Sequence, residues 1–398
     1  MQSLSQLYRI GAGPSSSHTM APLAACQEIS ARFGPEAHYK VTLYGSLAKT
    51  GKGHGTDTVI ERLWPGRVEV AFDFDTPTEH PNTFHVEVSD GDTQRDFWVE
   101  SIGGGAFSIQ GEPTITPPEI YPERSFTQIK EFCIRRGVRL PDYVRHYEPR
   151  IFPYLEEVWL RMKEAVCRGL VADGELPGGL HVARKARVLY THLSPHEQSE
   201  IRFNRLVCSY AYAVAEENAA GGTVVTAPTC GACGVLPAVL YYMQTTYGYT
   251  DEQIIDAIAA AGVVGNVIKT NASISGAECG CQAEIGSACS MAAAAVSELH
   301  SLSLEQIEGA AEIAMEHHLG LTCDPLMGIV QIPCIERNAV AAIRAINAMS
   351  LATFLSFASK IGFDAVVRTM YETGKDLSHK YRETAEGGLA NIIIQSPH

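Results

Sequence analysis

Hydrophobic and polar residues alternate along residues 40–101, which predicts β-strands in this part of the chain. Within 67–75 every second residue is apolar, namely Val68, Val70, Phe72 and Phe74. Residues 85–100 contain two further strand-like runs, separated by an Asp-Gly pair at 90–91 that is typical of a hairpin turn. We therefore expect a small sheet near the start of the chain.

After about residue 150 the apolar residues recur every three or four positions, which predicts helices. The clearest examples are 155–170 and the segment that begins at Asp251. The segment 303–320 opens with the residues of a capping box and ends at a glycine. A helix that begins near Glu336 is rich in alanine and apolar on most faces, so we expect it to be buried at the centre of this region.

A proline-rich segment separates these two patterns. Residues 112–122 contain four prolines and follow a glycine, which is typical of a linker or of the edge of a domain. We predict an α+β domain over residues 1–150, followed by an all-α domain over residues 151–398. The sequence shows no internal repeat and no low-complexity tract.

The composition is that of an ordinary globular protein, and its charge argues against two kinds of partner. Of 398 residues, 45% are hydrophobic and 19% are charged, with a formal net charge of −14. Because this charge repels phosphate groups, we expect no nucleic acid and no membrane as partner. The N-terminus lacks the apolar core of a signal peptide, and the apolar stretch 339–357 is interrupted by Arg344 and Asn347. We therefore predict a cytoplasmic enzyme that acts on a small molecule.

Seven of the eleven cysteines lie between residues 230 and 334. In a reducing compartment this concentration favours free thiols or soft-metal ligands over disulfides. Cys230 and Cys233 form a Cys-x-x-Cys pair that fits half a zinc site or a redox couple, but no second pair accompanies it. Cys281, Cys323 and Cys334 are separated by 42 and 11 residues, a spacing that matches no zinc or ferredoxin pattern. Three thiolates from three turns would leave a fourth metal coordination position open for a substrate.

Two further segments carry groups that can bind or activate a small molecule. Residues 13–19, GPSSSHT, place three hydroxyls beside His18, and such a turn can hold a carboxylate or phosphate or simply cap the next helix. Residues 44–57 surround Lys52 and His54 with glycines, and Asp57 could orient the imidazole of His54. A purely structural histidine is the alternative interpretation of this loop.

Together these segments resemble, in order and over nearly the whole chain, the single-chain iron–sulfur-dependent L-serine dehydratases (L-serine ammonia-lyases). The resemblance is carried by GPSSSHT, GSLAKTGKGHGTD, SIGGG, LPGGL, TAPTCGACGVLPAVL, SISGAECGCQAEIG, AEIAMEHHLGLTCDP, QIPCIERNA and KYRETAEGGLA. It implies a [4Fe–4S] cluster on Cys281, Cys323 and Cys334, and β-elimination from L-serine to pyruvate and ammonia without pyridoxal phosphate. It also implies a homodimer, and a first domain similar to the allosteric substrate-binding domain of phosphoglycerate dehydrogenase.

The same resemblance implies roles for residues in both predicted domains. His54 is implied as the base that removes the α-proton, with His18 as a second catalytic residue. Substrate-binding positions are implied at Ser15, Ser16, Ser17, Thr19, Lys52, Thr56, Asp57 and Ser275; Cys230 is added to them as a hypothesis of its own. Because the histidines precede residue 150 and the cysteines follow it, we expect the active site at the interface of the two domains.

The sequence departs from the family pattern at several positions close to these motifs: Cys230, Cys233, Cys279, His318 and the pair Leu326–Met327. Cys230 stands where the family has asparagine, and we hypothesise that it contacts the substrate or the open iron. Alternative functions are elimination from L-cysteine, L-threonine or another 3-hydroxy amino acid, a non-catalytic iron–sulfur sensor or regulatory paralogue, and a zinc-structured interaction protein. No context favours a pyridoxal Schiff base at Lys49, Lys52 or Lys269.

Overall fold

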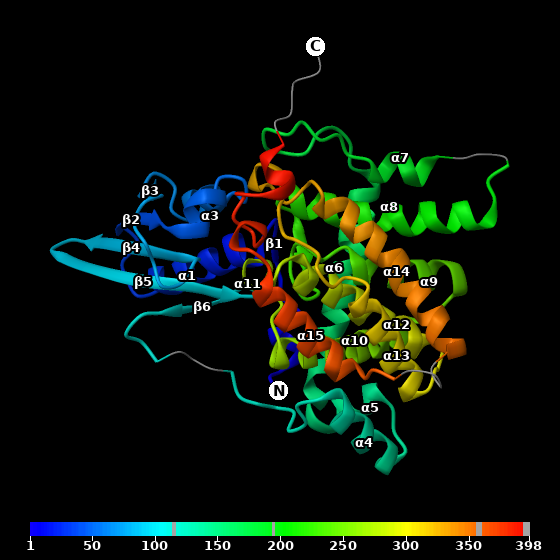
Figure 1. The fold of residues 1–398 in the computed structure, drawn as a ribbon. Coiled ribbons are helices and arrows are strands. Elements are labelled where there is room, and N and C mark those ends of the chain that lie inside the picture. The colour runs from blue at the N-terminus through cyan, green and yellow to red at the C-terminus, as the bar shows by residue number, and fades with distance from the viewer. Residues whose placement is uncertain (114–116, 193–195, 356–359, 393–398) are drawn as a thin grey trace.

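A computed structural model describes residues 1–113, 117–192, 196–355 and 360–392, which form a small sheet domain attached to a larger helical body (Figure 1). The sheet has the order β3-β2-β4-β5-β6. Its strands are β2 (His38–Leu43), β3 (Val68–Phe72), β4 (Thr83–Asp90), β5 (Thr93–Gly103) and β6 (Ala106–Ile109). β2 pairs in parallel with β3 and antiparallel with β4, so that Val41 lies opposite both Val70 and Val86. The predicted sheet and its hairpin after Asp90 are confirmed.

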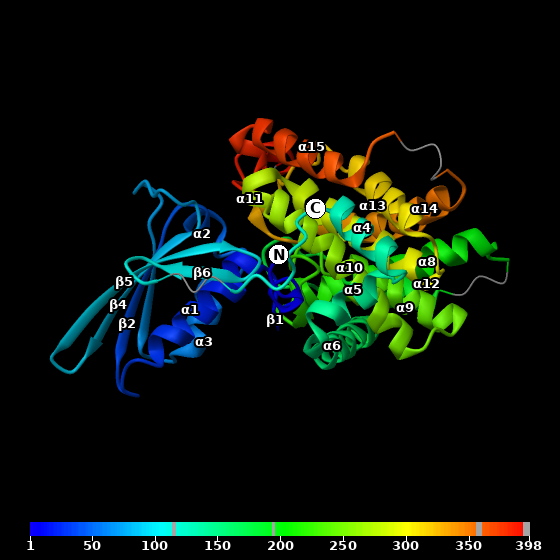
Figure 2. The same ribbon diagram turned by 90° about the horizontal axis from the view of Figure 1, so that it is seen from below.

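Three helices complete the small domain: α1 (Ala21–Ser30), α2 (Gly45–Thr50) and α3 (Thr56–Leu63). Figure 2 shows α1 and α3 on the same face of the sheet. Alternate residues of β2, Val41 and Leu43, are buried in one core with Ile29 of α1 and Ile60 of α3. Phe74, the last residue of the predicted alternating run, lies beyond the end of β3 and is exposed.

The helical body contains α4 (Phe126–Arg136), α5 (Leu140–Tyr147), α6 (Phe152–Val171), α7 (Ala186–Thr191), α8 (Ser199–Ala219), α9 (Val235–Tyr247), α10 (Asp251–Asn271), α11 (Gly276–Cys279), α12 (Ser287–Leu299), α13 (Leu304–Glu316), α14 (Cys334–Leu355) and α15 (Phe363–Asp376). A short antiparallel pair, β1 (Ile10–Ala12) and β7 (Thr223–Val225), lies beside them. The predicted helices over 155–170, from Asp251 and over 303–320 are confirmed as α6, α10 and α13. The capping box of α13 forms as predicted, although the helix ends at Glu316, before the glycine.

The central helix of this body is α12, not the helix that begins near Glu336. Nearly every residue of α12 is buried, and α9, α10, α13 and α14 pack around it. The prediction for α14 is therefore wrong. Its alanines, such as Ala341 and Ala345, face inward, but Val340 and Phe354 are largely exposed. A sequence rich in alanine is apolar on every helical face, although only one face of this helix packs against other helices.

Two hydrophobic cores divide the chain at a place different from the predicted boundary at residue 150. The smaller core extends from Ala25 to Ile109. The larger core includes Leu4 and Tyr8 near the N-terminus and continues from Tyr121 through the helices. The first residues of the chain and the helices α4 and α5 thus pack with the helical body. The described parts of the proline-rich segment, 112–113 and 117–122, lie between the last strand of the small domain and α4, as the composition suggests.

Two helices, α10 and α14, are long and apolar enough to cross a membrane by length and composition alone. The most apolar window of α10 is 72% buried inside the protein, as in the core helix of a folded domain. The corresponding share in α14 is 44%, because one face of this helix is exposed. Both helices pack against α12, so their length and composition are weak evidence for a membrane span.

Candidate functional site

Three cysteines from separate elements line one cavity between the small domain and the helical body. Cys281 precedes a π-helical turn, Cys334 is the first residue of α14, and Cys323 lies in an extended segment that pairs with Arg382. We call this space the cysteine cavity. Its other lining residues are Pro14, Ser15, Ser16, Gly231, Glu284, Pro325, Val330 and Glu383. The structure therefore brings the three predicted cysteine ligands together with two of the predicted substrate-binding serines.

Cys281 is the most acidic of the three thiols. A hydrogen bond from the Cys323 thiol lowers the pKa of Cys281, and the nearby Arg337 guanidinium acts in the same direction. The pKa of Cys323 is raised because it donates that bond, and burial raises the pKa of Cys334. A thiolate beside a cation, with two further thiols on the same cavity, is a donor set for a soft metal.

Arg337 is held in place by residues that adjoin Cys323. It donates a hydrogen bond to the carbonyl of Thr322 at 2.6 Å, and its Nη2 lies 3.6 Å from Asp324 Oδ1. Asp324 also accepts a hydrogen bond from the backbone N–H of Leu389 at 2.9 Å. A Cβ on Gly388 would lie 2.0 Å from Asp324 Oδ2, so only glycine fits there. Asp324 thus ties the C-terminal segment to the wall of the cysteine cavity.

The residues around the three sulfurs are closely packed, and the spacing of the sulfurs indicates whether one ion could join them. A Cβ on Gly276 would lie 3.1 Å from Cys323 Sγ and 2.8 Å from Glu284 Oε2, so a glycine is needed for the backbone to pack this closely against both groups. Among the described residues, His18, His54 and Glu383 form a group whose ligand atoms all lie within 4.8 Å of one another. The three cysteines do not form such a group, and their sulfurs are therefore spaced too widely to share a single ion.

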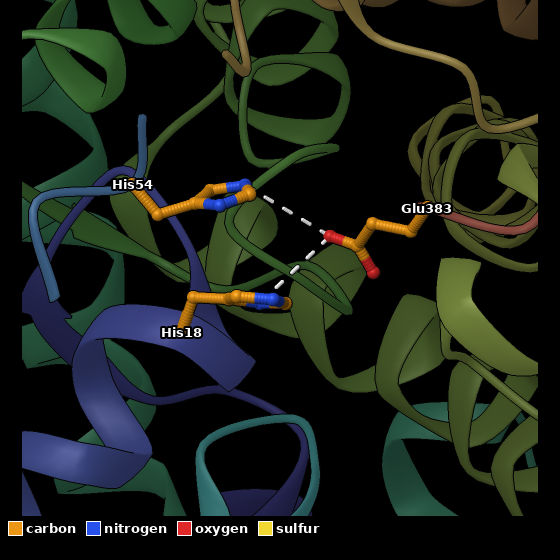
Figure 3. Close-up of side chains that lie close together, drawn as sticks. All are labelled: His18, His54 and Glu383. Carbon is orange, nitrogen blue, oxygen red and sulfur yellow. Dashed lines mark ion pairs between the residues drawn. The ribbon is translucent and has the colours of Figure 1, made fainter. Parts of the chain in front are cut away.

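His18 and His54 stack on each other and face Glu383 (Figure 3). Their ring centroids are 4.3 Å apart. Glu383 Oε1 lies 3.9 Å from His18 Nδ1 and 3.9 Å from His54 Nε2. His18 lies in the π-helical turn that leads into α1, and His54 lies in the loop between α2 and α3. The small domain therefore supplies both fully buried imidazoles, while the C-terminal segment supplies the carboxyl group.

Hydrogen bonds fix which nitrogen of each imidazole carries the proton. His54 Nδ1 donates to the carbonyl of Thr50 at 2.9 Å, so Nε2 has the lone pair, and it has no hydrogen-bond partner among the described residues. The Ser46 hydroxyl donates to the backbone carbonyl of Glu383 at 3.3 Å and accepts from His18 Nε2 at 3.0 Å. His18 Nδ1 therefore also has a lone pair. Both rings direct a basic nitrogen towards the Glu383 carboxyl group.

Burial sets the charge of all three groups. It lowers the pKa of His18 well below its usual value and the pKa of His54 to about 4, so both imidazoles are neutral near pH 7. Burial raises the pKa of Glu383 well above the usual value, so this carboxyl group keeps its proton. A neutral imidazole with a free lone pair in a water-poor site can accept a proton from a bound molecule.

Thr19 and Thr56 hold the two histidine segments against each other. The Thr19 hydroxyl donates to the carbonyl of His54 at 2.9 Å, and the Thr56 hydroxyl donates to the carbonyl of His18 at 2.6 Å. Both threonines are fully buried. The resemblance implies substrate contacts for these hydroxyls, but the structure gives them backbone partners. Their position explains how two histidines from separate loops come to be stacked.

Two candidate residues close to His54 in the sequence, Lys52 and Asp57, have other partners than the His54 imidazole. Lys52 is exposed, and its ammonium group lies 5.2 Å from the centroid of the Phe72 ring. Asp57 accepts a hydrogen bond from the backbone N–H of Thr58 at 2.8 Å. The expectation that Asp57 orients the imidazole of His54 is wrong, because the carbonyl of Thr50 binds Nδ1 instead.

Three further candidates lie outside the lining of the cysteine cavity. Ser17 is buried behind it, and Ser275 lines a neighbouring cleft. Cys230 is 1% exposed, and its thiol lies 3.8 Å from Met20 Sδ. The other departures from the family pattern share this placement, since none of them is among the described residues that line the cavity: Cys233, Cys279, His318, Leu326 and Met327.

Three charged residues of the site were not predicted: Glu284, Arg337 and Glu383. Glu284 follows Cys281 by three positions and Arg337 follows Cys334 by three, a spacing that places side chains on one face of a helix. That spacing could have identified both. Glu383 is brought to the site by its backbone N–H, which donates to the carbonyl of Cys323 at 2.8 Å. No local sequence pattern predicts this contact between Cys323 and Glu383, because the two residues are far apart in the chain.

A buried set of thiols and neutral bases between two domains is the combination expected of an enzyme. The family model "Serine dehydratase beta chain" matches residues 3–62, and "Serine dehydratase alpha chain" matches residues 74–390. L-serine dehydratase 1 of Escherichia coli K12 is 40% identical, over 98% of this chain and 99% of that protein. L-serine dehydratases of Streptomyces coelicolor and Helicobacter pylori 26695 are 39% and 35% identical, over 99% and 98% of this chain and 99% of each relative. The chain belongs to the serine dehydratase family, and the single-chain type fits.

Proposed function

We propose that this protein is an L-serine ammonia-lyase that uses an iron–sulfur cluster to convert L-serine into pyruvate and ammonia. The observation that carries this proposal is the approach of three cysteines and two neutral histidines to one buried region. Its substrate is supported by the relatives, which are named L-serine dehydratases and match over nearly their whole length. A cytoplasmic location and a homodimer are part of the proposal and rest on the sequence resemblance.

Cys281, Cys323 and Cys334 would hold a [4Fe–4S] cluster. The three cysteines line one cavity, and Arg337 offsets the negative charge of the Cys281 thiolate. When bound by three thiolates, such a cluster supplies one iron with an open coordination position, which acts as a Lewis acid for oxygen atoms of the substrate.

The turn that holds Ser15 and Ser16 is suited to bind the carboxylate of an amino acid. Both side chains are buried and line the cysteine cavity. The Ser15 hydroxyl accepts a hydrogen bond from the backbone N–H of His18 at 3.1 Å and lies 3.4 Å from His18 Nδ1. The same turn thus joins the proposed carboxylate site to the histidine pair.

We assign removal of the α-proton to His54. The Cα–H bond breaks and the proton moves to the Nε2 lone pair, while the Cβ–O bond breaks and the hydroxyl group leaves with the electron pair. The resulting 2-aminoacrylate tautomerises to an imine, which water hydrolyses to pyruvate and ammonia. Glu383 is a positioning residue, because its protonated carboxyl group faces the basic nitrogens of both rings.

The lining of the cysteine cavity gives no reason to depart from L-serine, the substrate that the names of the relatives support. Cys230 and the other unusual residues of this chain are not among the described residues that line this cavity. The hypothesis that Cys230 contacts the substrate has no support in this geometry, since its thiol packs against Met20. Changed specificity would require a change on the lining itself.

The test is anaerobic reconstitution of the full chain with iron and sulfide, followed by assays with L-serine, L-threonine and L-cysteine. We expect pyruvate from L-serine, and a change in the paramagnetic resonance of the reduced cluster when L-serine is added. If a cluster binds but its paramagnetic resonance does not change with any of the three amino acids, and no keto acid forms, the proposal is overturned in favour of a non-catalytic cluster protein.

A further inference from the structure

A second cavity lies between the same two domains and has no part in the proposed reaction. Its volume is about 380 Å³, within the range of pockets that bind small molecules. The helical body contributes Gln2, Gln6, Arg9 and Lys269 to its wall, and the small domain contributes Ile102 and Phe107 among others. We call it the cationic cavity, because Arg9 and Lys269 present their charged groups there.

Neither of these two cations has a carboxylate partner among the residues that the structure describes. Arg9 donates to the carbonyl of Gly105 at 3.0 Å and to Gln6 Oε1 at 2.8 Å, and its Nε is buried without a hydrogen-bond partner. Lys269 donates to Gln2 Oε1 at 3.2 Å and to the carbonyl of Gln6 at 3.0 Å. Every partner is neutral, and within the described part of the chain no carboxylate oxygen lies within 4.0 Å of either cation.

Half-buried cations differ in this respect: in the described part of the chain Arg344 and Arg382 also lack a carboxylate oxygen within 4.0 Å, whereas others have one. Elsewhere Arg184 lies 3.0 Å from Glu217, and Arg205 lies 2.6 Å from Glu197. Two carboxylates do line the cationic cavity, Glu28 and Glu112, but Arg32 binds both of them, at 2.8 Å and 2.9 Å.

Without a counter-ion, the burial of Arg9 and Lys269 is electrostatically unfavourable, and an anionic ligand would reduce this free-energy cost. Burial, and to a lesser extent Arg9, lower the pKa of Lys269 to about 8. Two like charges held together away from water are unfavourable unless an anion joins them.

We propose that the cationic cavity binds a small carboxylate anion, held by Arg9 and Lys269. The apolar wall formed by Ile102, Ala106, Phe107 and Ile109 indicates a carboxylate with a short hydrocarbon body rather than a bare inorganic anion. Polar groups that fix orientation within a largely apolar wall are the usual design of a small-molecule site. This site would be additional to the cysteine cavity and does not depend on the proposed reaction.

The ligand would contact residues of both domains. Lys269 belongs to α10 and Arg9 directly precedes β1, whereas Phe107 belongs to β6 of the small domain. The glycine-rich segment after β5 forms part of the wall, and Gly103 lines both the cationic cavity and the neighbouring cleft that holds Ser275. Gly103, Gly104 and Gly105 all have positive φ, so other residues would be strained in this shared wall.

The test is calorimetric titration of the anaerobically purified, iron-replete full chain with sodium propanoate at constant ionic strength, with inorganic phosphate as a second ligand. We expect propanoate to bind with a dissociation constant of about 1 mM or tighter, and phosphate to bind more weakly. Lys269→Gln should weaken propanoate binding by about tenfold or more, because a charged hydrogen bond is lost. Lys269→Arg should retain binding, and so should Lys40→Gln, which removes an exposed lysine of β2 that pairs with Glu87.

Further measurements separate this proposal from the proposed function. Ser15→Ala alters the cysteine cavity and should leave propanoate binding unchanged. Propanoate should also protect Lys269 of the unmodified chain from an amine-reactive reagent, as read by peptide mass spectrometry, and this result does not require that any variant fold. Unchanged binding in Lys269→Gln, loss of binding in Ser15→Ala, absence of protection, or tighter binding of phosphate than of propanoate would each overturn the proposal.

Discussion

Two cavities that lie between the same two domains of this protein differ in what burial does there, although in both it lowers the pKa of basic side chains. In the cysteine cavity and the histidine pair beside it, burial makes His54 neutral, so that a base is available at pH 7. In the cationic cavity, Arg9 and Lys269 line one space, and neither pairs with a carboxylate of the described residues. The first environment is suited to proton transfer and the second to recognition of a negative charge. Substitutions in the two cavities should therefore have separable effects.

The largest expected effect is that of Cys281→Ser. The hydroxyl group is a poor ligand for a soft metal, and this position holds the most acidic of the three thiols. We expect bound iron to fall to background and turnover of L-serine to vanish, while propanoate binding in the cationic cavity is retained. Cys279→Ser is the matched control, because Cys279 lies two residues away but does not line the cavity. Equal iron content in both variants would contradict the ligand assignment.

His54→Gln should follow in magnitude. Glutamine retains a hydrogen-bonding side chain but has no basic nitrogen, so we expect kcat to fall by about 10²- to 10⁴-fold. The absorption spectrum of the bound cluster should not change, because His54 is not one of the proposed ligands. His85→Gln, on the sheet of the small domain, provides the control for loss of a histidine. A kcat within a few-fold of the original would remove His54 from the proposed mechanism.

The pH dependence of kcat/KM tests the environment of the same residue. Since burial lowers the pKa of His54 to about 4, its Nε2 lone pair is present at neutral pH and is lost as pH falls through that value. We expect no loss from this group between pH 7 and about pH 5, and a tenfold fall per pH unit below about pH 4. The measurement is an anaerobic pH profile at constant cluster absorbance. An acidic limb centred near pH 6.5 would indicate an exposed histidine instead.

The smallest effect on catalysis is expected for Cys230→Ser. The new hydroxyl would be buried where the thiol now packs against Met20, and an unpaired buried hydroxyl costs about 1–3 kcal/mol. The temperature of thermal unfolding should fall, while the ratio of kcat/KM for L-serine to that for L-threonine stays the same. A changed ratio would place Cys230 in contact with the substrate and would restore the hypothesis drawn from the sequence.

Local patterns predicted most of the fold, and long-range packing decided the rest. The alternation in β2, β3 and β4 and the capping box of α13 depend on residues close in sequence, and all of these elements form. The position of α14 depends on which neighbours cover it, which its own alanines do not specify. The division between the cores likewise depends on the return of the helices after Tyr121 to the first residues of the chain.

The candidate site shows the same limit at the level of single residues. Motifs identified the three cysteines, both histidines and the serines that line the cavity, because each lies in a distinctive local sequence. Motifs did not identify Glu383, since its place is set by backbone pairing with Cys323. They also attributed substrate contacts to Thr19 and Thr56, because a polar residue in a motif can serve the fold of a loop as readily as a ligand.

The pairing of β2 with β4 has a consequence for any protein of this fold that is encoded as two polypeptides instead of one. β2 falls in the part that matches the beta-chain model and β4 in the part that matches the alpha-chain model, and six residue pairs join them. His18 and His54 belong to the first part, whereas Glu383 and the three cysteines belong to the second. If the gene were split between the two matches, one continuous sheet would be shared by two polypeptides. Each polypeptide would then carry an unpaired strand edge and an incomplete site, so such a pair would be an obligate heterodimer.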